Sequence, residues 1–362
     1  MKSGKSYKNY KGEREFDAIV IGSGMGGMTT GALLARRGKR VLVLERHYTA
    51  GGFTHVFKRR DYEWDVGIHY LGEVGWERSD GAKIFRYISD DQMEWADMGE
   101  EYDRIVFPDR AYGFVKGPQN FAANLKKWFP EEAEAIDQYM VLIRKVTGAA
   151  SKLFFAERAI PGMFSSLVGG MMRKKMLRYA RRTTAEVLDE ITQNERLKAV
   201  LCGQYGDYGL PPKQSSFAIH CMVATHYLYG AAYPVGGSER IAETVLPVIE
   251  AGGGTTLVRA EVDEIIVEKG KAVGVRMADG GEFRSKLVIS NAGYFNTVER
   301  LVPKAERKRF PSMESQGLTP SIGHFCLYLG LKHTAEELDL KSTNLWIYPS
   351  YDHDQNVADF LE

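Results

Sequence analysis

The sequence predicts an α/β fold that is built on a parallel sheet and interrupted by an inserted α+β domain. A short apolar run at residues 16–21 leads into a glycine-rich loop and a helix-forming segment, and an acidic residue, Glu45, ends the next apolar run. A second group of strand and hairpin signals, at residues 257–289, follows a long middle region. The sheet domain is therefore expected to be discontinuous in the sequence.

The first strand is predicted at residues 16–21, where apolar and β-branched residues follow one another without polar alternation. That pattern is typical of a strand covered on both faces in a parallel sheet. The loop Gly22-Ser23-Gly24-Met25-Gly26-Gly27 then fits the GxGxxG pattern, and small residues over 28–37 suit a helix packed closely on the sheet. In such a Rossmann-like unit Gly22 permits the tight turn, Gly24 lets a pyrophosphate approach the backbone, and Gly27 lets helix and strand touch.

The second strand is predicted at residues 39–45 and ends in Glu45, 18 residues beyond Gly27. A carboxylate at this place can accept hydrogen bonds from both hydroxyls of an adenosine ribose. It would repel a 2′-phosphate, so NADP is not expected. GxGxxG alone occurs often by chance, but here strand, loop, helix and acid agree. The pattern therefore favours dinucleotide binding over a merely structural turn.

The glycine pair Gly51-Gly52 distinguishes the two dinucleotides that remain, FAD and NAD. It stands six residues after Glu45 and is followed by Phe53-Thr54-His55. A glycine pair there lets the chain pass over the flavin end of a dinucleotide without side chains in the way. The pattern favours FAD.

The composition describes a globular chain without a strong overall charge. The 362 residues are 44% hydrophobic, and 48 basic against 47 acidic side chains give a net charge of +1, so no overall field draws the chain to nucleic acid. Cys202, Cys221 and Cys326 are too few and too far apart for a disulfide framework and are predicted to be mostly buried free thiols in a reducing, cytoplasmic compartment. No apolar run reaches the roughly 18 to 20 residues that a membrane-spanning helix needs.

The motifs resemble those of a flavoprotein family, the phytoene desaturases, carotenoid isomerases and all-trans-retinol saturases. Many flavoenzymes share the glycine motifs, but GIHY at residues 67–70 and YPxGG at 233–237, with His226-Tyr227 between them, point to the retinol-saturase-like branch. The resemblance runs from about Phe16 to the end of the chain. It is carried by residues 21–27, 43–47, 51–52, 65–70, 206–212, 216–217, 220, 226–227, 233–238 and 288–293.

The resemblance implies FAD as the cofactor, a polyene-type lipid as the substrate and association with a membrane. In similar flavoproteins the residue at the place of Val262 meets the adenine through its backbone. Arg46 lies in the segment 43–47, which is one of those that carry the resemblance. The expected cofactor site comprises Gly22, Ser23, Gly24, Gly26, Gly27, Glu45, Arg46, Gly51, Gly52 and Val262. Members of the family also have a glycine-rich segment near the C-terminus that covers the flavin. Nothing after Gly330 matches it, so we expect a C-terminally truncated sequence.

The same signals predict the domain boundaries. We expect a flexible basic tail at residues 1–14, an FAD-binding domain at 15–88 and 234–300, and a substrate and membrane-associating domain at 89–233 and 301–362 whose C-terminal part is incomplete. The tail is basic but has no apolar stretch behind it, so it is not a secretory signal peptide. Within these domains, strands are predicted at 257–259, 262–268, 272–277 and 283–289, and helices at 130–149 and 238–250.

His69 is the candidate catalytic residue, because an imidazole in the loop after the glycine pair could relay a proton at neutral pH. A buried structural histidine is the alternative. The histidines show no HxxxH or HxH pairing, so no metal is expected. Residues 158–185 hold seven basic and no acidic side chains, interleaved with apolar ones. Such a stretch can lie in a lipid headgroup layer, although a solvated helix face over a core would look the same.

The sequence therefore predicts an FAD-dependent oxidoreductase that acts on C=C or CH–CH bonds of a conjugated isoprenoid by saturation, desaturation or isomerisation, with an unidentified electron partner. One alternative is an FAD-dependent amine oxidase, and another is a non-catalytic prenyl or lipid carrier resembling GDP dissociation inhibitors. The basic, methionine-rich stretch argues against the first alternative. Intact Gly22, Gly24, Gly27 and Glu45 argue against the second.

Overall fold

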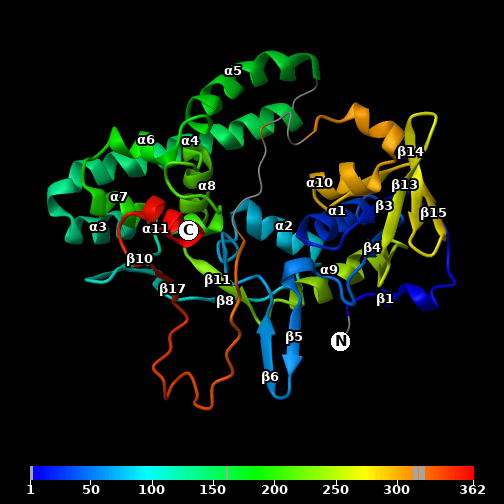
Figure 1. The fold of residues 1–362 in the computed structure, drawn as a ribbon, viewed down its shortest axis with the longest axis horizontal. Helices are drawn as coiled ribbons and strands as arrows, with labels where there is room; N and C mark the ends of the chain where they lie inside the picture. Colours follow the sequence, from blue (N-terminus) through cyan, green and yellow to red (C-terminus); the bar gives the residue numbers. More distant parts are fainter. Residues whose placement is uncertain (1–2, 160–161, 313–316, 318–322) are drawn as a thin grey trace. The chain divides into compact units, whose positions relative to one another are not determined.

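The structure is a computed structural model that describes residues 3–159, 162–312, 317 and 323–362. The chain forms two compact units (Figure 1). Unit 1 comprises Met1–Tyr70, Glu77–Ala96 and Tyr233–Pro320, and unit 2 comprises Leu71–Trp76, Asp97–Ala232 and Ser321–Glu362. Both units are discontinuous in the sequence, as the predicted fold class requires.

Unit 1 is built on a five-stranded parallel sheet. Its strands lie in the order β1 (Lys5–Ser6), β12 (Thr255–Val258), β4 (Val41–Glu45), β3 (Ala18–Ile21) and β16 (Val288–Ser290). The helix α1 (Met25–Ala35) connects β3 to β4, which gives the predicted strand, loop, helix and strand unit. The chain adds β4 and β12 on one side of β3 and β16 on the other. The direction of strand addition therefore reverses between β3 and β16.

The central strands are buried on both faces because alternate side chains enter two different cores. Ala18 and Val20 pack with α1 and α9 (Arg240–Ala251), whereas Ile19 and Ile21 pack with a second sheet on the opposite face. All four side chains are at most 6% exposed. The prediction of a strand covered on both faces is confirmed.

The second sheet of unit 1 has four strands in the order β13 (Val262–Glu268), β14 (Lys271–Met277), β15 (Glu282–Ser285) and β2 (Glu15–Phe16). The single strand predicted at 283–289 is wrong: β15 pairs with β14, and β16 pairs with β3 in the parallel sheet. Between them the Ser285 hydroxyl donates to the Leu287 carbonyl (2.9 Å) and accepts from the Leu287 N–H (3.1 Å). This local turn competes with strand pairing and breaks the run.

The other elements in and next to unit 1 are short. They are the 3₁₀ turns η1 (Tyr7–Asn9), η2 (Gly52–Thr54) and η6 (Lys304–Arg309), the hairpin β5 (Val56–Arg59) and β6 (Tyr62–Asp65), α2 (Asp80–Ile88), β8 (Trp95–Asp97), α10 (Tyr294–Asn296) and the π-helical turn η5 (Thr297–Leu301). Figure 1 shows β5 and β6 as a hairpin of their own.

Unit 2 is mainly helical. Its helices are α3 (Pro118–Trp128), α4 (Ala133–Ala159), α5 (Gly162–Ala180), α6 (Thr184–Asp189), α7 (Glu195–Leu201), α8 (Phe217–Tyr227) and α11 (His353–Leu361), with 3₁₀ turns η3 (Pro130–Glu132) and η4 (Tyr205–Asp207). The strands β9 (Glu101–Val106), β10 (Ala111–Val115) and β17 (Asn344–Ile347) form one sheet, and β7 (Leu71–Gly72) pairs with β11 (Ala231–Pro234). The helix predicted at 130–149 is longer than expected, because α4 continues to Ala159 alongside α5 (Figure 1).

The expected flexible tail is corrected by the structure. Within residues 3–14, β1 forms the edge of the parallel sheet by pairing with β12, and the rings of Tyr7 and Tyr10 pack 6.1 Å and 6.0 Å from the ring of Phe283. The Arg14 guanidinium lies 4.7 Å from the same ring. The basic side chains of this segment predicted a flexible tail, but its two tyrosines can bury apolar surface and so hold it on the sheet.

None of the helices in the described ranges is both long and apolar enough to cross a bilayer. The basic stretch at 158–185 covers the end of α4, α5 and the turn that follows it. Residues 160–161 lie outside the described residues, and so do the side chains of 155–168. Within the described part, Arg173, Lys174 and Arg178 are exposed.

Candidate dinucleotide-binding site

A cavity in unit 1 lies at the carboxyl ends of β3 and β16. Gly22 follows β3 and Asn291 follows β16, and the Asn291 N–H donates to the Ile21 carbonyl at 2.8 Å. This is the point where the strand order reverses, and in open α/β sheets ligands bind in the crevice outside such a point. The cavity has a volume of about 730 Å³ and is lined by the glycine-rich loop, the end of β4, residues 51–54, residues 260–263, residues 291–292, Asn296 and residues 300–301.

The glycine-rich loop is shaped by close contacts that leave no room for side chains. Gly22 has a φ of +95°, which L side chains rarely adopt. A Cβ on Gly27 would lie 2.0 Å from the Gly22 carbonyl oxygen, and a Cβ on Gly26 would lie 2.7 Å from the Asn291 Oδ1. Gly24 is the N-cap of α1 and no side chain caps this end. The first N–H groups of α1 are therefore directed at an anion placed over Gly24.

Glu45 is tied to the glycine-rich loop. Its Oε2 accepts hydrogen bonds from the Ser23 N–H (2.9 Å) and hydroxyl (2.6 Å), and its Oε1 accepts from the His47 N–H (2.9 Å). A carboxylate offers about four lone-pair sites, so three bonds leave acceptor capacity for a ribose hydroxyl. Glu45 is half-buried and lines the cavity, as expected of a ribose-binding acid.

The glycine pair also lines the cavity, next to the glycine-rich loop. Gly51 and Gly52 both have left-handed backbones, with φ of +119° and +58°. A Cβ on Gly52 would lie 2.8 Å from the Gly24 Cα, so the pair and the glycine-rich loop touch backbone to backbone. The Gly51 N–H also donates to the Ser23 hydroxyl at 3.1 Å. Ser23 is 0% exposed and lies between the pair and Glu45 rather than at the cavity surface.

Arg46 and Val262 also line the cavity. Arg46 is exposed at its rim, and Val262 begins β13 next to Ala260 and Glu261. The structure therefore brings the predicted set together: Gly22, Gly24, Glu45, Arg46, Gly51, Gly52 and Val262 face one cavity, while Ser23, Gly26 and Gly27 shape the loop behind it.

Several polar side chains at this cavity are not part of the predicted site, among them Asn291 and Arg300. Asn291 lies beside four of the loop glycines, Gly22, Gly24, Gly26 and Gly27: its Nδ2 would be 3.3 Å from a Cβ on Gly24. The segment 288–293 is one of those that carry the family resemblance. The position of Asn291 directly after a predicted strand was the signal that could have assigned it to the site. Arg300 lies on a π-helical turn, which no sequence pattern indicated.

His69 is exposed, in the loop after β6, and its ring meets the Tyr70 ring edge-on at 4.3 Å. It is not among the described residues that line the dinucleotide cavity. Its catalytic role therefore stays a prediction.

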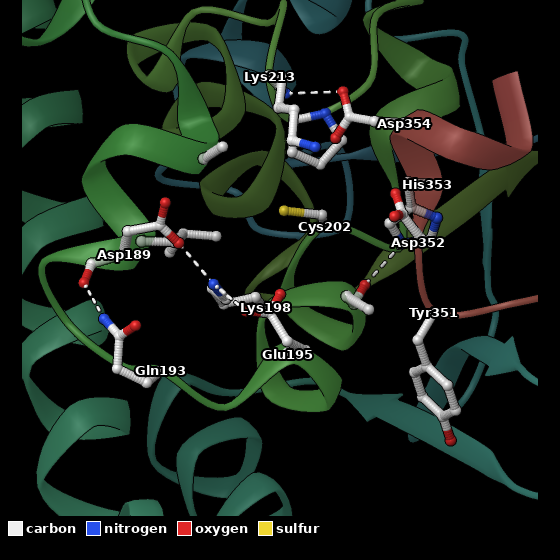
Figure 2. Close-up of a pocket in the computed structure, with 14 residues that line it drawn as sticks. Asp189, Gln193, Glu195, Lys198, Cys202, Lys213, Tyr351, Asp352, His353 and Asp354 are labelled. Carbon is white, nitrogen blue, oxygen red and sulfur yellow. Dashed lines mark hydrogen bonds and ion pairs between the residues drawn. The ribbon is translucent and has the colours of Figure 1, made fainter. Parts of the chain in front are cut away.

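A second cavity, of about 550 Å³, lies within unit 2 where α11 meets α7 (Figure 2). The His353 Nε2 donates to the Ala199 carbonyl (2.8 Å), the Asp354 Oδ1 accepts from the Lys213 N–H (3.0 Å), and Lys198 pairs with Asp189 (2.5 Å). Burial raises the pKa of the Cys202 thiol in this wall, so the thiol stays protonated at neutral pH. The contacts of His353 and Asp354 hold α11 in place, and we assign no chemistry to this cavity.

The strand order, the glycine-rich loop and the acid at the end of β4 are those of a Rossmann-like dinucleotide-binding fold. Residues 20–88 match the model of a protein family described as an NAD(P)-binding Rossmann-like domain. A solved structure of putrescine oxidase bound to putrescine shares the fold, with a TM-score of 0.54 at 14% identity over 81% of this chain and 62% of that one. The predicted fold class is confirmed.

Relatives narrow the class. The chain is 38% identical over 359 residues to an all-trans-retinol 13,14-reductase of Danio rerio, which covers 96% of the chain. It is 32% identical over 371 residues to a Danio rerio protein named an inactive all-trans-retinol 13,14-reductase, and 25% identical over 313 residues to a 4,4′-diapophytoene desaturase of a Methylomonas species, covering 99% and 86% of the chain. The chain spans 59%, 61% and 60% of these three relatives. The resemblance to retinol saturases and carotenoid desaturases is confirmed.

Proposed function

We propose that the protein is an FAD-dependent oxidoreductase that acts on C=C or CH–CH bonds of a conjugated isoprenoid, such as a retinol or a carotenoid. The observation that carries the proposal is the single cavity in which the glycine-rich loop, Glu45 and the glycine pair meet. The similarity to proteins named for retinol and diapophytoene supports the substrate class.

The residues of the cavity fit an FAD. Glu45 would hold the adenosine ribose through its remaining lone pairs, and the amides at the start of α1 would hold the pyrophosphate. Gly52 would let the chain pass close to the dinucleotide, since any side chain there would collide with Gly24. The backbone at Val262 would meet the adenine, and Arg46 would lie at the rim. Two observations support this fit: no side chain caps the start of α1, and the glycine-rich loop and Gly52 leave no room for Cβ atoms.

When bound, FAD would supply hydride exchange with a carbon of the polyene. The chain's own contribution would be to hold the dinucleotide rigidly, to orient its reactive end and to keep water away. His69 is our proposed proton relay, on the grounds that it follows the β6 strand of the same unit and is accessible to a substrate. Saturation would need a reductant and a proton, whereas desaturation would need an electron acceptor, so the direction of the reaction would set the kind of electron partner.

We also propose a cytoplasmic protein with peripheral membrane contact, because a polyene substrate dissolves in lipid rather than in water. The exposed Arg173, Lys174 and Arg178 of α5 are the described cations best suited to anionic headgroups. Co-sedimentation with anionic vesicles should fall when these three are replaced by Glu. Equal sedimentation of the triple variant would exclude this surface as the contact.

The function is tested by incubating the FAD-loaded protein with all-trans-retinol or a carotenoid, with and without dithionite, and measuring product mass. A gain of two mass units with dithionite indicates saturation, a loss of two without it indicates desaturation, and an unchanged mass with altered retention indicates isomerisation. An unchanged polyene in every arm, together with hydrogen peroxide release from amines, would replace the proposal by the amine oxidase alternative.

A further inference from the structure

The side chain of Asp65, the last residue of β6, joins two segments that are 173 residues apart in the sequence. Its Oδ1 accepts hydrogen bonds from the Ser238 N–H (3.2 Å) and from the Ser238 hydroxyl (2.5 Å), and its Oδ2 accepts from the Tyr233 hydroxyl. Ser238 is 0% exposed. Burial and the hydrogen bond to Asp65 raise the pKa of Tyr233, so its hydroxyl remains a donor. We call these three residues the Asp65 hub.

The Asp65 hub reaches the glycine pair through Thr54. The Ser238 hydroxyl lies 3.0 Å from the Thr54 carbonyl oxygen, and the Thr54 hydroxyl donates to the Gly51 carbonyl at 2.9 Å. The backbone adds a further link, because the Gly67 N–H, two residues after Asp65, donates to the Phe53 carbonyl at 3.1 Å. Residues 51–54 are therefore held by contacts with Ser238 and Gly67, which are not among the described residues that line the cavity.

The glycine pair transmits this position to the glycine-rich loop. The Gly51 N–H contacts the Ser23 hydroxyl (3.1 Å), and the Ser23 hydroxyl donates to Glu45 (2.6 Å). Gly52 is already so close to Gly24 that a Cβ would lie 2.8 Å from its Cα. The two backbones are packed closely, with little space between them. A small displacement of the glycine pair would therefore change the shape of the cavity.

We propose that Asp65 is a positioning residue for the dinucleotide: held by Tyr233 and Ser238, it fixes the glycine pair against the glycine-rich loop at the spacing that admits a pyrophosphate. The proposal rests on the proposed binding of FAD. It also gives one physical reason for the segments 65–70 and 233–238, which carried the family resemblance separately, to occur in one chain. The contacts end on backbone that lines the cavity, which favours positioning over stabilisation of the core alone.

The test compares Tyr233→Phe and Asp65→Asn with the control Asp61→Asn, an exposed acid at the turn of the same hairpin. Dissociation constants for FAD and for ADP are measured by calorimetry at a temperature at which circular dichroism shows each apoprotein folded. We expect both hub variants to raise the Kd of FAD by about 2- to 30-fold, the usual range for side chains that act through others. ADP, which shares the pyrophosphate, should weaken in parallel, and the control should bind as the wild type does.

The outcomes separate this proposal from the function on which it rests. Hub variants that bind FAD with the wild-type Kd and show only a lower melting temperature would overturn the positioning role and leave FAD binding intact. A wild-type chain that binds neither FAD nor ADP would overturn both. If Asp65→Asn does not fold, Tyr233→Phe decides, because it removes one hydroxyl and leaves the ring in place.

Discussion

Glu45 accepts two hydrogen bonds from Ser23 through the same carboxylate oxygen, one from the N–H at 2.9 Å and one from the hydroxyl at 2.6 Å. The acid that would bind the ribose and the loop that would bind the pyrophosphate are therefore one unit. Removing the acid should weaken dinucleotide binding in two ways, by losing a ribose acceptor and by releasing the loop.

Glu45→Gln should lower FAD affinity by about 1.5 to 3 kcal/mol, the contribution of a hydrogen bond to a charged partner, or roughly 10- to 150-fold in Kd. Ser23→Ala removes only the link to the loop, so it should have a smaller effect. Both constants can be measured by quenching of flavin fluorescence. An undiminished affinity in Glu45→Gln would remove this residue from the site.

Gly52→Ala should abolish FAD binding, because its Cβ would lie 2.8 Å from the Gly24 Cα at the wall of the cavity. Gly38→Ala is the matched control: Gly38 also has a positive φ, +73°, but a Cβ there would meet nothing within 4 Å. Both changes should destabilise the fold by about 1 to 2 kcal/mol through backbone strain. Only Gly52→Ala should lose the cofactor, and equal FAD retention by the two variants would contradict the close approach of the two backbones.

The fold should lose stability in mild acid because of His220. This buried imidazole lies between the hydroxyls of Tyr139 (3.0 Å) and Tyr208 (3.1 Å), and burial lowers its pKa to about 4. The unfolded chain binds the proton near pH 6.5 and the folded chain does not, so stability is lost as the pH falls below 6.5 toward 4. This one group should make the free energy of unfolding about 2 kcal/mol lower at pH 5 than at pH 7.5.

Urea unfolding of the wild type and of His220→Gln at the two pH values checks this expectation. The amide can bond both tyrosines but does not titrate, so the variant should lose that much less stability on acidification. Identical pH slopes in the two proteins would show that His220 does not titrate in this way.

Removing residues 1–12 should lower the free energy of unfolding by about 1 to 3 kcal/mol, because the cut removes β1 and the tyrosines that pack on Phe283. The double variant Lys8→Ala, Lys11→Ala changes only exposed cations of the same segment and should be neutral. Chemical denaturation measures both. A truncated chain as stable as the wild type would restore the interpretation of this segment as a flexible tail.

The glycine-rich loop and its surroundings were predictable because the role of each residue there depends on its neighbours in the sequence. Gly22, Gly24, Gly27 and Glu45 obey a spacing set by one strand, one turn and one helix, and the structure places them at one cavity. The division of the predicted strand 283–289 into β15 and β16 was not predictable from its apolar residues. It is caused by the Ser285 hydroxyl, which bonds to the backbone of Leu287.

The contacts of Asp65 with Tyr233 and Ser238 lay beyond the sequence argument for a different reason. They join segments 168 and 173 residues apart, and no periodicity relates them. The segments themselves were visible as motifs, but which side chains meet depends on how β6 and the start of α9 are placed by the sheet. His69, predicted from its place in the loop after the glycine pair, is exposed and is not among the described residues that line the cavity, whereas Asp65 of the segment 65–70 is connected to the cavity wall.

The most direct test of the account is the visible absorbance spectrum of the purified 362-residue chain after incubation with FAD and removal of unbound cofactor. We predict a yellow protein that carries one FAD per chain and releases it to excess ADP, and we predict that Glu45→Gln retains less FAD than the wild type. A folded but colourless protein that binds neither FAD nor ADP would contradict the central claim.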